Sequence, residues 1–300
     1  MPLQKIRMPK NKIQYLNQIE LKVKDVAGEF IKTAITTGVG ILKDNNTSFP
    51  VSSSSGFFAG DLVYVFGGNG NENLTSIFSV ESLNEIILEG DLTGIPAGSV
   101  IKKSESLAYL DEAVALYSRY KHLEKIETTT IEKPGNVFDL PESWQNGFSK
   151  INFIEYPVDN TPIILIPQEE YEIVLTESGN YALRFAYDLS DSYRICFVLP
   201  HYFDETKDPP TATAPDCDFF CICNIAAGFY LLALANRYGQ SINAGLSADS
   251  VNYDTKCDQY RRLAKELFYQ AASWLGITLS AIDGTFLEQA PASSDQETNF

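Results

Sequence analysis

The sequence predicts an α+β protein: about three long helices form a scaffold that carries a β-hairpin or β-sheet insertion, and a small β-barrel-like module lies near the N-terminus. Three observations lead to this prediction. Apolar residues recur at helical spacing in the stretches 104–125, 215–239 and 254–276. Residues 126–203 are rich in β-branched and aromatic residues and are broken by turn sequences. Residues 38–103 are short β-type runs separated by Ser, Gly and Asn.

These patterns divide the chain into four segments. Residues 1–37 form a basic N-terminal arm with weak helical spacing, and residues 38–103 form the β module. The main domain covers 104–277, with the β insertion at 126–203 inside it. Residues 278–300 are polar and lose all periodicity, so we expect a flexible C-terminal arm that orders on binding.

The three long helices differ in how their apolar residues are distributed. The first has one apolar stripe and ends in basic residues that suit the helix dipole. From Phe219 to Leu234 apolar residues occupy nearly every face, and such a helix must be buried. The last helix is amphipathic, with Tyr260, Leu267 and Trp274 on one face and charged residues on the other. We therefore expect the first helix to pack against the pair that follows the insertion.

Charge and hydropathy exclude several classes of partner. The 300 residues carry a formal net charge of -16, so attraction to nucleic-acid phosphates or to an anionic membrane is not the main source of binding. The N-terminal residues do not reach the apolar stretch of a secretion signal. The longest apolar run, 219–235, is shorter than a membrane span and is interrupted by Asn224 and Gly228. We expect a soluble protein, made in the cytoplasm, that binds other proteins.

The sequence predicts neither a metal site, nor a cofactor, nor a catalytic site. The spacing of Cys217, Cys221 and Cys223 does not match a zinc site, and we interpret these residues as small buried hydrophobes. The odd total of five cysteines suggests no disulfide framework. A catalytic or metal role would require His122 and His201 to converge with partners that the sequence does not identify, so we interpret His122, near the end of the first helix, as a surface or capping residue. The common hydrolase, metalloprotease and dinucleotide-binding motifs are absent.

Five phrases in a fixed order carry a resemblance to a known family, and the likeness covers about residues 105–277. They are AVALYSRYKHLEK, DLPESWQNGFSKINFIEYPVDNTP, LRFAYDLSDSYRICFVLPHYF, DCDFFCICNIAAGFYLLALANRYGQS and SADSVNYDTKCDQYRRLAKELFYQAASWLGI. In this succession the chain resembles the head-to-tail connector, or adaptor, proteins of tailed bacteriophages and prophages. It departs from the compact, mainly helical adaptors by its β module and its long β insertion.

The resemblance implies a structural protein in the neck of a virion. Family adaptors form a ring of about twelve copies that matches the portal above and binds the next neck or tail component. DNA passes through the lumen without sequence readout, and an acidic lumen lets a polyanion slide. The candidate lumen-facing residues are Asp249, Asp254 and Asp258. The simpler alternative is that these acids only stabilise a solvated helix N-terminus.

The family also has C-terminal arms that reach a portal subunit. The candidate partner-binding residues of this arm are Phe286, Leu287 and Phe300. A tail-completion, baseplate or capsid decoration protein is the alternative function, and in that case the β modules would be the binding surfaces. An enzyme is the third possibility, and it is the one that the missing motifs disfavour.

Overall fold

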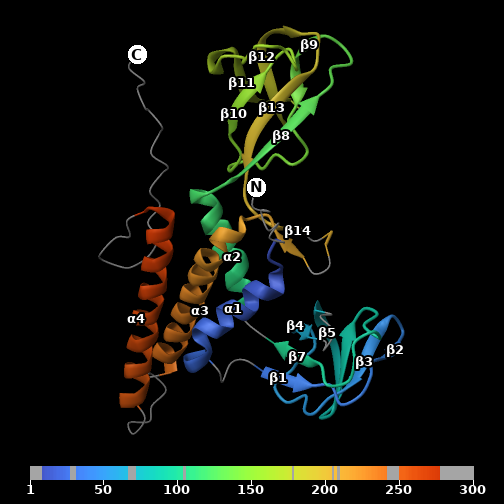
Figure 1. Cartoon of the computed structure of the whole chain (residues 1–300), viewed down its shortest axis with the longest axis vertical. Helices are drawn as coiled ribbons and strands as arrows, with labels where there is room; N and C mark the ends of the chain where they lie inside the picture. The colour runs from blue at the N-terminus through green and yellow to red at the C-terminus, as the bar shows by residue number, and fades with distance from the viewer. Residues whose placement is uncertain are drawn as a thin grey trace, which may run out of the picture. The chain divides into compact units, whose positions relative to one another are not determined.

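The chain forms two compact units, and the sequence of one is inserted within the sequence of the other (Figure 1). The computed structural model describes residues 9–27, 32–66, 72–103, 106–177, 179–204, 206–207, 210–241 and 250–277. Unit 1 contains Met1–Leu116 together with Tyr202–Phe300, and unit 2 contains Tyr117–His201. The two segments of unit 1 meet where the chain before α3 pairs with the chain before α1, since the Ala212 N–H donates to the Lys10 carbonyl over 2.9 Å.

Four α-helices lie in the described part of the chain: α1 (Lys12–Ala27), α2 (Ser106–Tyr120), α3 (Phe219–Ser241) and α4 (Ser250–Leu275). A short turn, η3 (Asp216–Asp218), leads into α3, and the strand pair β14 (Phe203–Asp204) and β15 (Thr211–Ala212) lies before it. Both α1 and α4 pack against α3. Because α3 is apolar on nearly all of its faces, this packing buries most of it, including Ile222, Ile225, Ala226, Tyr230 and Leu234.

The α3 and α4 helices run antiparallel and approach closely at a glycine. The Asn224 amide donates to Gln270 Oε1 over 3.2 Å, and further along α3 the ring of Phe268 lies over Gly228. A Cβ atom on Gly228 would lie 2.5 Å from Phe268 Cε1, closer than any real carbon contact. The Phe268 side chain is 2% exposed. The absence of a side chain at residue 228 therefore sets the distance between the two helices.

Between α1 and α2, unit 1 contains a seven-stranded antiparallel sheet of order β1-β7-β4-β5-β6-β3-β2. Its strands are β1 (Lys32–Ile35), β2 (Ile41–Lys43), β3 (Asn46–Pro50), β4 (Leu62–Phe66), β5 (Glu72–Ser82), β6 (Glu85–Glu89) and β7 (Val100–Lys103). The Thr37 N–H donates to the Pro50 carbonyl and the Ser52 N–H donates to the Ile35 carbonyl, both over 2.8 Å. These bonds join the end of β1 to the end of β3, so the sheet closes on itself.

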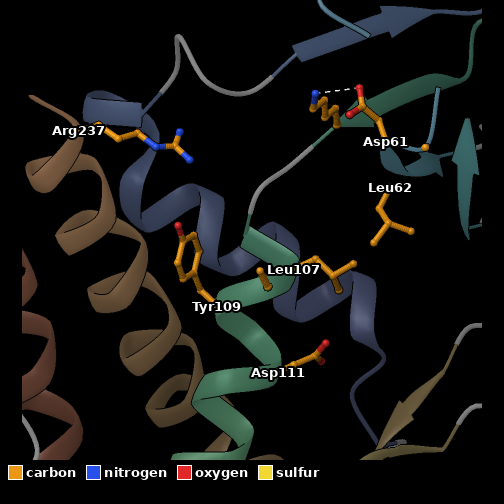
Figure 2. A pocket seen from close by; sticks show the side chains of 9 residues that line it. Asp61, Leu62, Leu107, Tyr109, Asp111 and Arg237 are labelled. Atoms are coloured by element: carbon orange, nitrogen blue, oxygen red, sulfur yellow. Dashed lines mark ion pairs between the residues drawn. The ribbon is translucent and has the colours of Figure 1, made fainter. Parts of the chain in front are cut away.

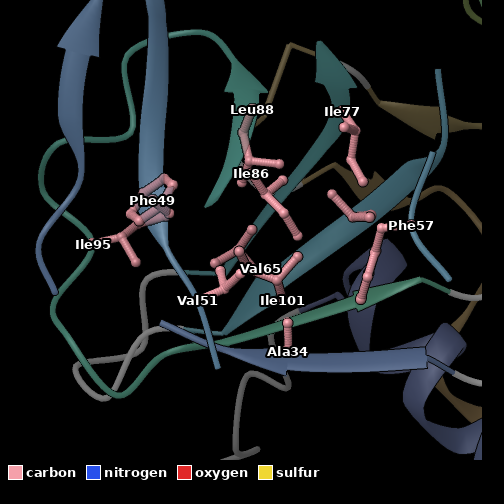
Figure 3. Close-up of a cluster of buried hydrophobic side chains, with 11 residues drawn as sticks. Ala34, Phe49, Val51, Phe57, Val65, Ile77, Ile86, Leu88, Ile95 and Ile101 are labelled. Atoms are coloured by element: carbon pink, nitrogen blue, oxygen red, sulfur yellow. The ribbon is translucent and has the colours of Figure 1, made fainter. Parts of the chain in front are cut away.

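The closed sheet encloses a core of buried apolar side chains (Figure 3). Figure 3 labels Ala34, Phe49, Val51, Phe57, Val65, Ile77, Ile86, Leu88, Ile95 and Ile101. Side-chain alternation places Val63 and Val65 of β4 in this core, while Tyr64 between them is buried on the other face of the strand, where its hydroxyl bonds to Glu20 of α1. The β2–β3 turn uses Asp44 and Asn45 at φ 48° and 67°, and these two residue types tolerate the left-handed region that such a hairpin requires.

Unit 2 consists of two three-stranded antiparallel sheets with one shared core. The first sheet has the order β10-β13-β8 and the second has the order β11-β12-β9. The strands are β8 (Leu123–Thr129), β9 (Gly135–Asp139), β10 (Ile151–Glu155), β11 (Tyr171–Leu175), β12 (Tyr181–Leu189) and β13 (Tyr193–Leu199), and the short turn η2 (Gln168–Glu170) precedes β11. Ile154, Ile195 and Phe197 of the first sheet pack with Leu183 and Phe185 of the second.

The predicted scaffold of about three long helices with a β insertion is wrong, although an α+β class is compatible with the structure. The described residues form fifteen strands and only four α-helices, and the largest assembly is the seven-stranded sheet. The first long helix was expected over 104–125, but α2 ends at Tyr120 and the chain enters β8 at Leu123. Every second side chain along β8 is exposed, which is the pattern of a strand. The chain therefore forms a strand there, although the apolar spacing also fits a helix.

Candidate interaction surfaces

The predicted lumen residues lie on or next to α4. Asp258 is exposed on α4, and Arg261 and Arg262 follow it by three and four residues, so they share its face of the helix. The surface around Asp258 therefore carries both signs of charge. Asp254 belongs to α4, but its side chain is outside the description, and Asp249 lies outside the described residues. Phe286, Leu287 and Phe300 also lie outside the described residues.

A pocket of about 450 Å³ lies in unit 1 between β4, β7, α2 and α3 (Figure 2). Its apolar lining includes Leu62, Leu107 and Tyr109, and its charged lining includes Asp61, Lys103, Asp111 and Arg237. The two carboxylates already face cations: Asp61 is 2.8 Å from Lys103, and Asp111 is 3.6 Å from Lys12. Apolar walls with neutralised charges suit an apolar group of a partner better than they suit proton transfer.

A buried polar cluster joins α1 to the closed sheet. Glu20 of α1 is 3% exposed, accepts a hydrogen bond from the Tyr64 hydroxyl and forms an ion pair with Lys102. Burial raises the pKa of Tyr64, which keeps its hydroxyl a donor. Burial also lowers the pKa of the Lys102 amine, while the adjacent Glu20 carboxylate favours the charged form. The cluster fixes one face of the sheet on α1, so its role is structural.

A second polar cluster positions a loop in unit 2. Glu155 is 2% exposed, and its carboxylate accepts hydrogen bonds from the Asp159 N–H over 3.0 Å and from Arg194 over 2.8 Å. Arg194 also donates to Asp159 over 2.8 Å, and the Asp159 carboxylate raises the pKa of the guanidinium. Asp159 has a φ of 64°, a left-handed conformation that the three-way contact holds in place. The segment that follows this loop is thereby set against β10.

Residues 163–165 follow this loop and lie at the edge of the sheet beside β10. They carry no charge, and we call them the apolar edge. The Tyr156 N–H donates to the Ile164 carbonyl over 3.0 Å, and the Ile166 N–H donates to the Ile154 carbonyl over 2.8 Å. The segment therefore pairs with β10 through one isolated antiparallel bridge, between Glu155 and Leu165. Ile163, Ile164 and Leu165 are 65%, 50% and 51% exposed. Three consecutive exposed aliphatic residues on an open strand are typical of a binding surface.

The described part of the chain shows how the potential metal ligands and the two histidines are placed. No group of three or more His, Cys, Asp or Glu side chains is placed there to hold a metal ion. His122 is exposed. His201 is 7% exposed, its backbone N–H donates to Ser118 Oγ over 2.8 Å, and its ring lies 5.3 Å from that of Tyr117. Among the described residues one helical stretch, Asp216–Tyr238, is long and apolar enough to span a membrane, and 72% of an apolar 18-residue window within it is buried inside the protein.

The cysteines are five free thiols that differ in accessibility. Cys221 and Cys223 are buried, as the sequence predicted. The prediction that Cys217 is also buried is wrong, because Cys217 is exposed. Burial raises the pKa of the Cys196 and Cys223 thiols, which keeps them protonated and unreactive.

We expect a maleimide reagent at neutral pH to label one thiol quickly, at Cys217. Cys196, Cys221, Cys223 and Cys257 are buried and should react about tenfold or more slowly, because they react only after local opening. Peptide mass mapping after a short reaction measures this, and Cys217→Ser serves as the control that removes the fast phase. Equal labelling of two or more cysteines would contradict the packing around α3.

The sequence predicted β-structure at residues 163–166, but it did not predict that side chains of this segment are exposed. The signal was present, since PIILIP has no charge, is bounded by Pro162 and Pro167, and lies outside any alternating pattern. The Glu155–Arg194–Asp159 cluster was missed because Arg194 is 39 residues from Glu155 and 35 residues from Asp159. No protein-family model matches the chain, and a search of curated proteins also finds no match.

Proposed function

We propose that the chain is a structural virion protein, a head-to-tail connector that forms a ring between the portal and the next neck or tail component. The observation that carries this proposal is the order of the five adaptor-like phrases. They fall in succession on α2 with β8, on β10, on β12 with β13, on α3 and on α4. The resemblance thus covers both units and all of the long helices except α1.

The packing of each unit supports a role in assembly. The α3 helix is buried against α1 and α4, which makes a stable base. Unit 2 presents exposed apolar residues on several strands, and obligate subunit contacts are built from such surfaces. These residues are Ile126, Val137, Ile163, Ile164, Leu165, Ile173, Leu175, Tyr181 and Tyr187.

The charge of the chain supports passage of DNA without capture. A net charge of -16 repels a polyanion, so a lumen lined by this protein would let DNA slide. Asp258 stands next to two arginines, and the acidic lining would therefore need other surfaces besides this part of α4. A tail-completion or decoration protein would use the same apolar surfaces to bind a different part of the virion. The test must therefore identify the viral structure to which the chain binds.

The test is binding to portal rings from the same viral or prophage genome, followed by sucrose-gradient sedimentation. We expect the full chain to sediment with the rings in a fixed ratio. A chain truncated after Ser280 retains α4, which ends at Leu275, so we expect it to be folded, with unchanged circular dichroism, but to stay at the top of the gradient.

Two outcomes would change the proposal. If the truncated chain sediments with the rings as the full chain does, the C-terminal arm is not the portal anchor, and the connector role stands without it. If the full chain does not bind portal rings but binds capsid shells, the chain is a decoration protein and the connector proposal is wrong.

A further inference from the structure

The apolar edge of unit 2 has unused backbone hydrogen-bonding groups. In the pairing with β10, Ile164 provides the carbonyl and Ile166 provides the N–H, while Leu165 lies opposite Glu155. In an antiparallel pair the residue between two bonded neighbours directs its own N–H and C=O away from the partner strand. The N–H and C=O of Leu165 therefore point outward from the sheet, where an added strand would meet them.

The opposite edge of the same sheet is β8, which pairs only with β13 among the described strands. The register forms a single row across the three strands and the apolar edge, since Thr128 lies opposite Arg194, Arg194 opposite Glu155, and Glu155 opposite Leu165. Each pairing in this row is antiparallel. β8 and the apolar edge therefore run in opposite directions, and a second copy in the same orientation would place its β8 antiparallel to the apolar edge.

The side chains on these two edges match. Residues directly opposite one another share a face of the sheet, so Thr128 and Leu165 lie on the same face. Ile126 is two residues from Thr128 and Ile163 is two residues from Leu165, and both therefore lie on that face as well. Ile126 is 57% exposed and Ile163 is 65% exposed. Head-to-tail pairing would bring three exposed aliphatic side chains into one cluster.

The charged residues of β8 do not oppose this pairing. Lys125 and Glu127 form an ion pair and both bond to Ser143, and Glu124 accepts a hydrogen bond from Asn152 over 3.0 Å. These charges are thus bound within one copy, whereas edge strands that resist pairing usually direct free charges outward.

We propose that the apolar edge of one copy binds β8 of a second copy, so that the β10-β13-β8 sheet continues from subunit to subunit. Such a contact is heterologous, because the two copies use different surfaces, and repeated contacts of this type form a closed ring or an open chain. The inference rests on the proposed ring and deepens it by identifying a contact between neighbouring subunits.

The test uses one variant for each edge and a matched control. Leu165→Pro removes the outward N–H without affecting the two bonds to β10, and proline is tolerated at such an edge position. Ile126→Lys places a charge on the β8 edge. Leu83→Lys is the control, because Leu83 is 74% exposed in the β5–β6 turn of unit 1. If the proline variant misfolds, Ile163→Lys takes its place.

We expect the wild type and the Leu83→Lys control to self-associate in sedimentation velocity as concentration rises. Each edge variant alone should lose this association, with a dissociation constant raised by about tenfold or more. An equimolar mixture of Leu165→Pro and Ile126→Lys should form dimers and stop there, because each pair of chains retains one intact apolar edge and one intact β8. No other arrangement of the two edges predicts this rescue.

Three results would overturn the inference. A wild-type chain that stays monomeric at the highest concentration reached has no such contact. Self-association of Ile126→Lys at the wild-type level, with loss in Leu165→Pro, would mean that the apolar edge pairs with itself or with another strand. Self-association of Leu165→Pro and Ile163→Lys at the wild-type level would place the contact elsewhere. Portal binding is measured separately, so loss of the edge contact and loss of the connector role are distinguishable.

Discussion

Phe268→Ala is expected to lower the free energy of unfolding of unit 1 by about 3–5 kcal/mol, the cost of removing a large aromatic side chain from a packed core. Phe268 is 2% exposed, contacts the ring of Phe229 at a centroid distance of 5.4 Å, and lies over Gly228. Native-state hydrogen exchange of the α3 amides measures the effect, because these amides report the opening of unit 1.

Gly228→Ala tests the same contact from the other helix. Alanine is the better helix former by about 1 kcal/mol, yet the clash with Phe268 should destabilise the protein by about 1–3 kcal/mol. In the Phe268→Ala background the clash is gone, and Gly228→Ala should become neutral or stabilising. Gly94→Ala is the control, since a Cβ there meets nothing within 4 Å. Equal effects of Gly228→Ala in both backgrounds would show that the two helices are not in close contact.

Glu20→Ala is expected to cost about 3 kcal/mol, the lower end of the range for breaking a buried ion pair, because the Lys102 amine keeps some contact with water. The change leaves the Lys102 amine and the Tyr64 hydroxyl without their carboxylate partner. Urea denaturation measures the loss of unfolding free energy, and hydrogen exchange of the amides in the closed sheet shows where the protein is destabilised.

Glu20→Leu combined with Lys102→Met and Tyr64→Phe should recover most of this loss, because an apolar set of similar volume needs no desolvation of charge and leaves no hydroxyl without its carboxylate acceptor. The matched control is the exposed pair of Lys43 and Glu85, which are 2.8 Å apart with half and one third of their side chains exposed. Glu85→Gln should have only a small effect. A comparable loss from Glu85→Gln and Glu20→Ala would mean that burial of the α1 cluster contributes nothing.

Local patterns in the sequence predict the buried helix well, because apolar residues on nearly every face of α3 leave it no stable position at the surface. They failed at α2, where the helical spacing continues past Tyr120 although the backbone turns into β8. Lys121, His122 and Leu123 fit either periodicity, and only the pairing of Leu123 with Leu199, 76 residues later, decides between them. The extent of the β-structure was underestimated for the same reason, since strand pairing across long separations leaves no local signal.

The candidate interaction surface was less predictable than the fold. Exposure of Ile163 and Leu165 depends on the Glu155 cluster, which joins residues 155, 159 and 194 and sets the preceding loop. Sequence patterns show that PIILIP is apolar, and an apolar run is normally a core strand. Only the register with β10 reveals that its outer backbone groups and two of its side chains face away from the core.

Electron cryomicroscopy of the full chain bound to portal rings tests the connector role most directly. The account predicts a closed ring whose cyclic symmetry matches the portal, with DNA able to pass along its axis and neighbouring copies joined through unit 2. A chain that binds portal rings as scattered single copies, or that decorates capsid shells and leaves the portal bare, would contradict it.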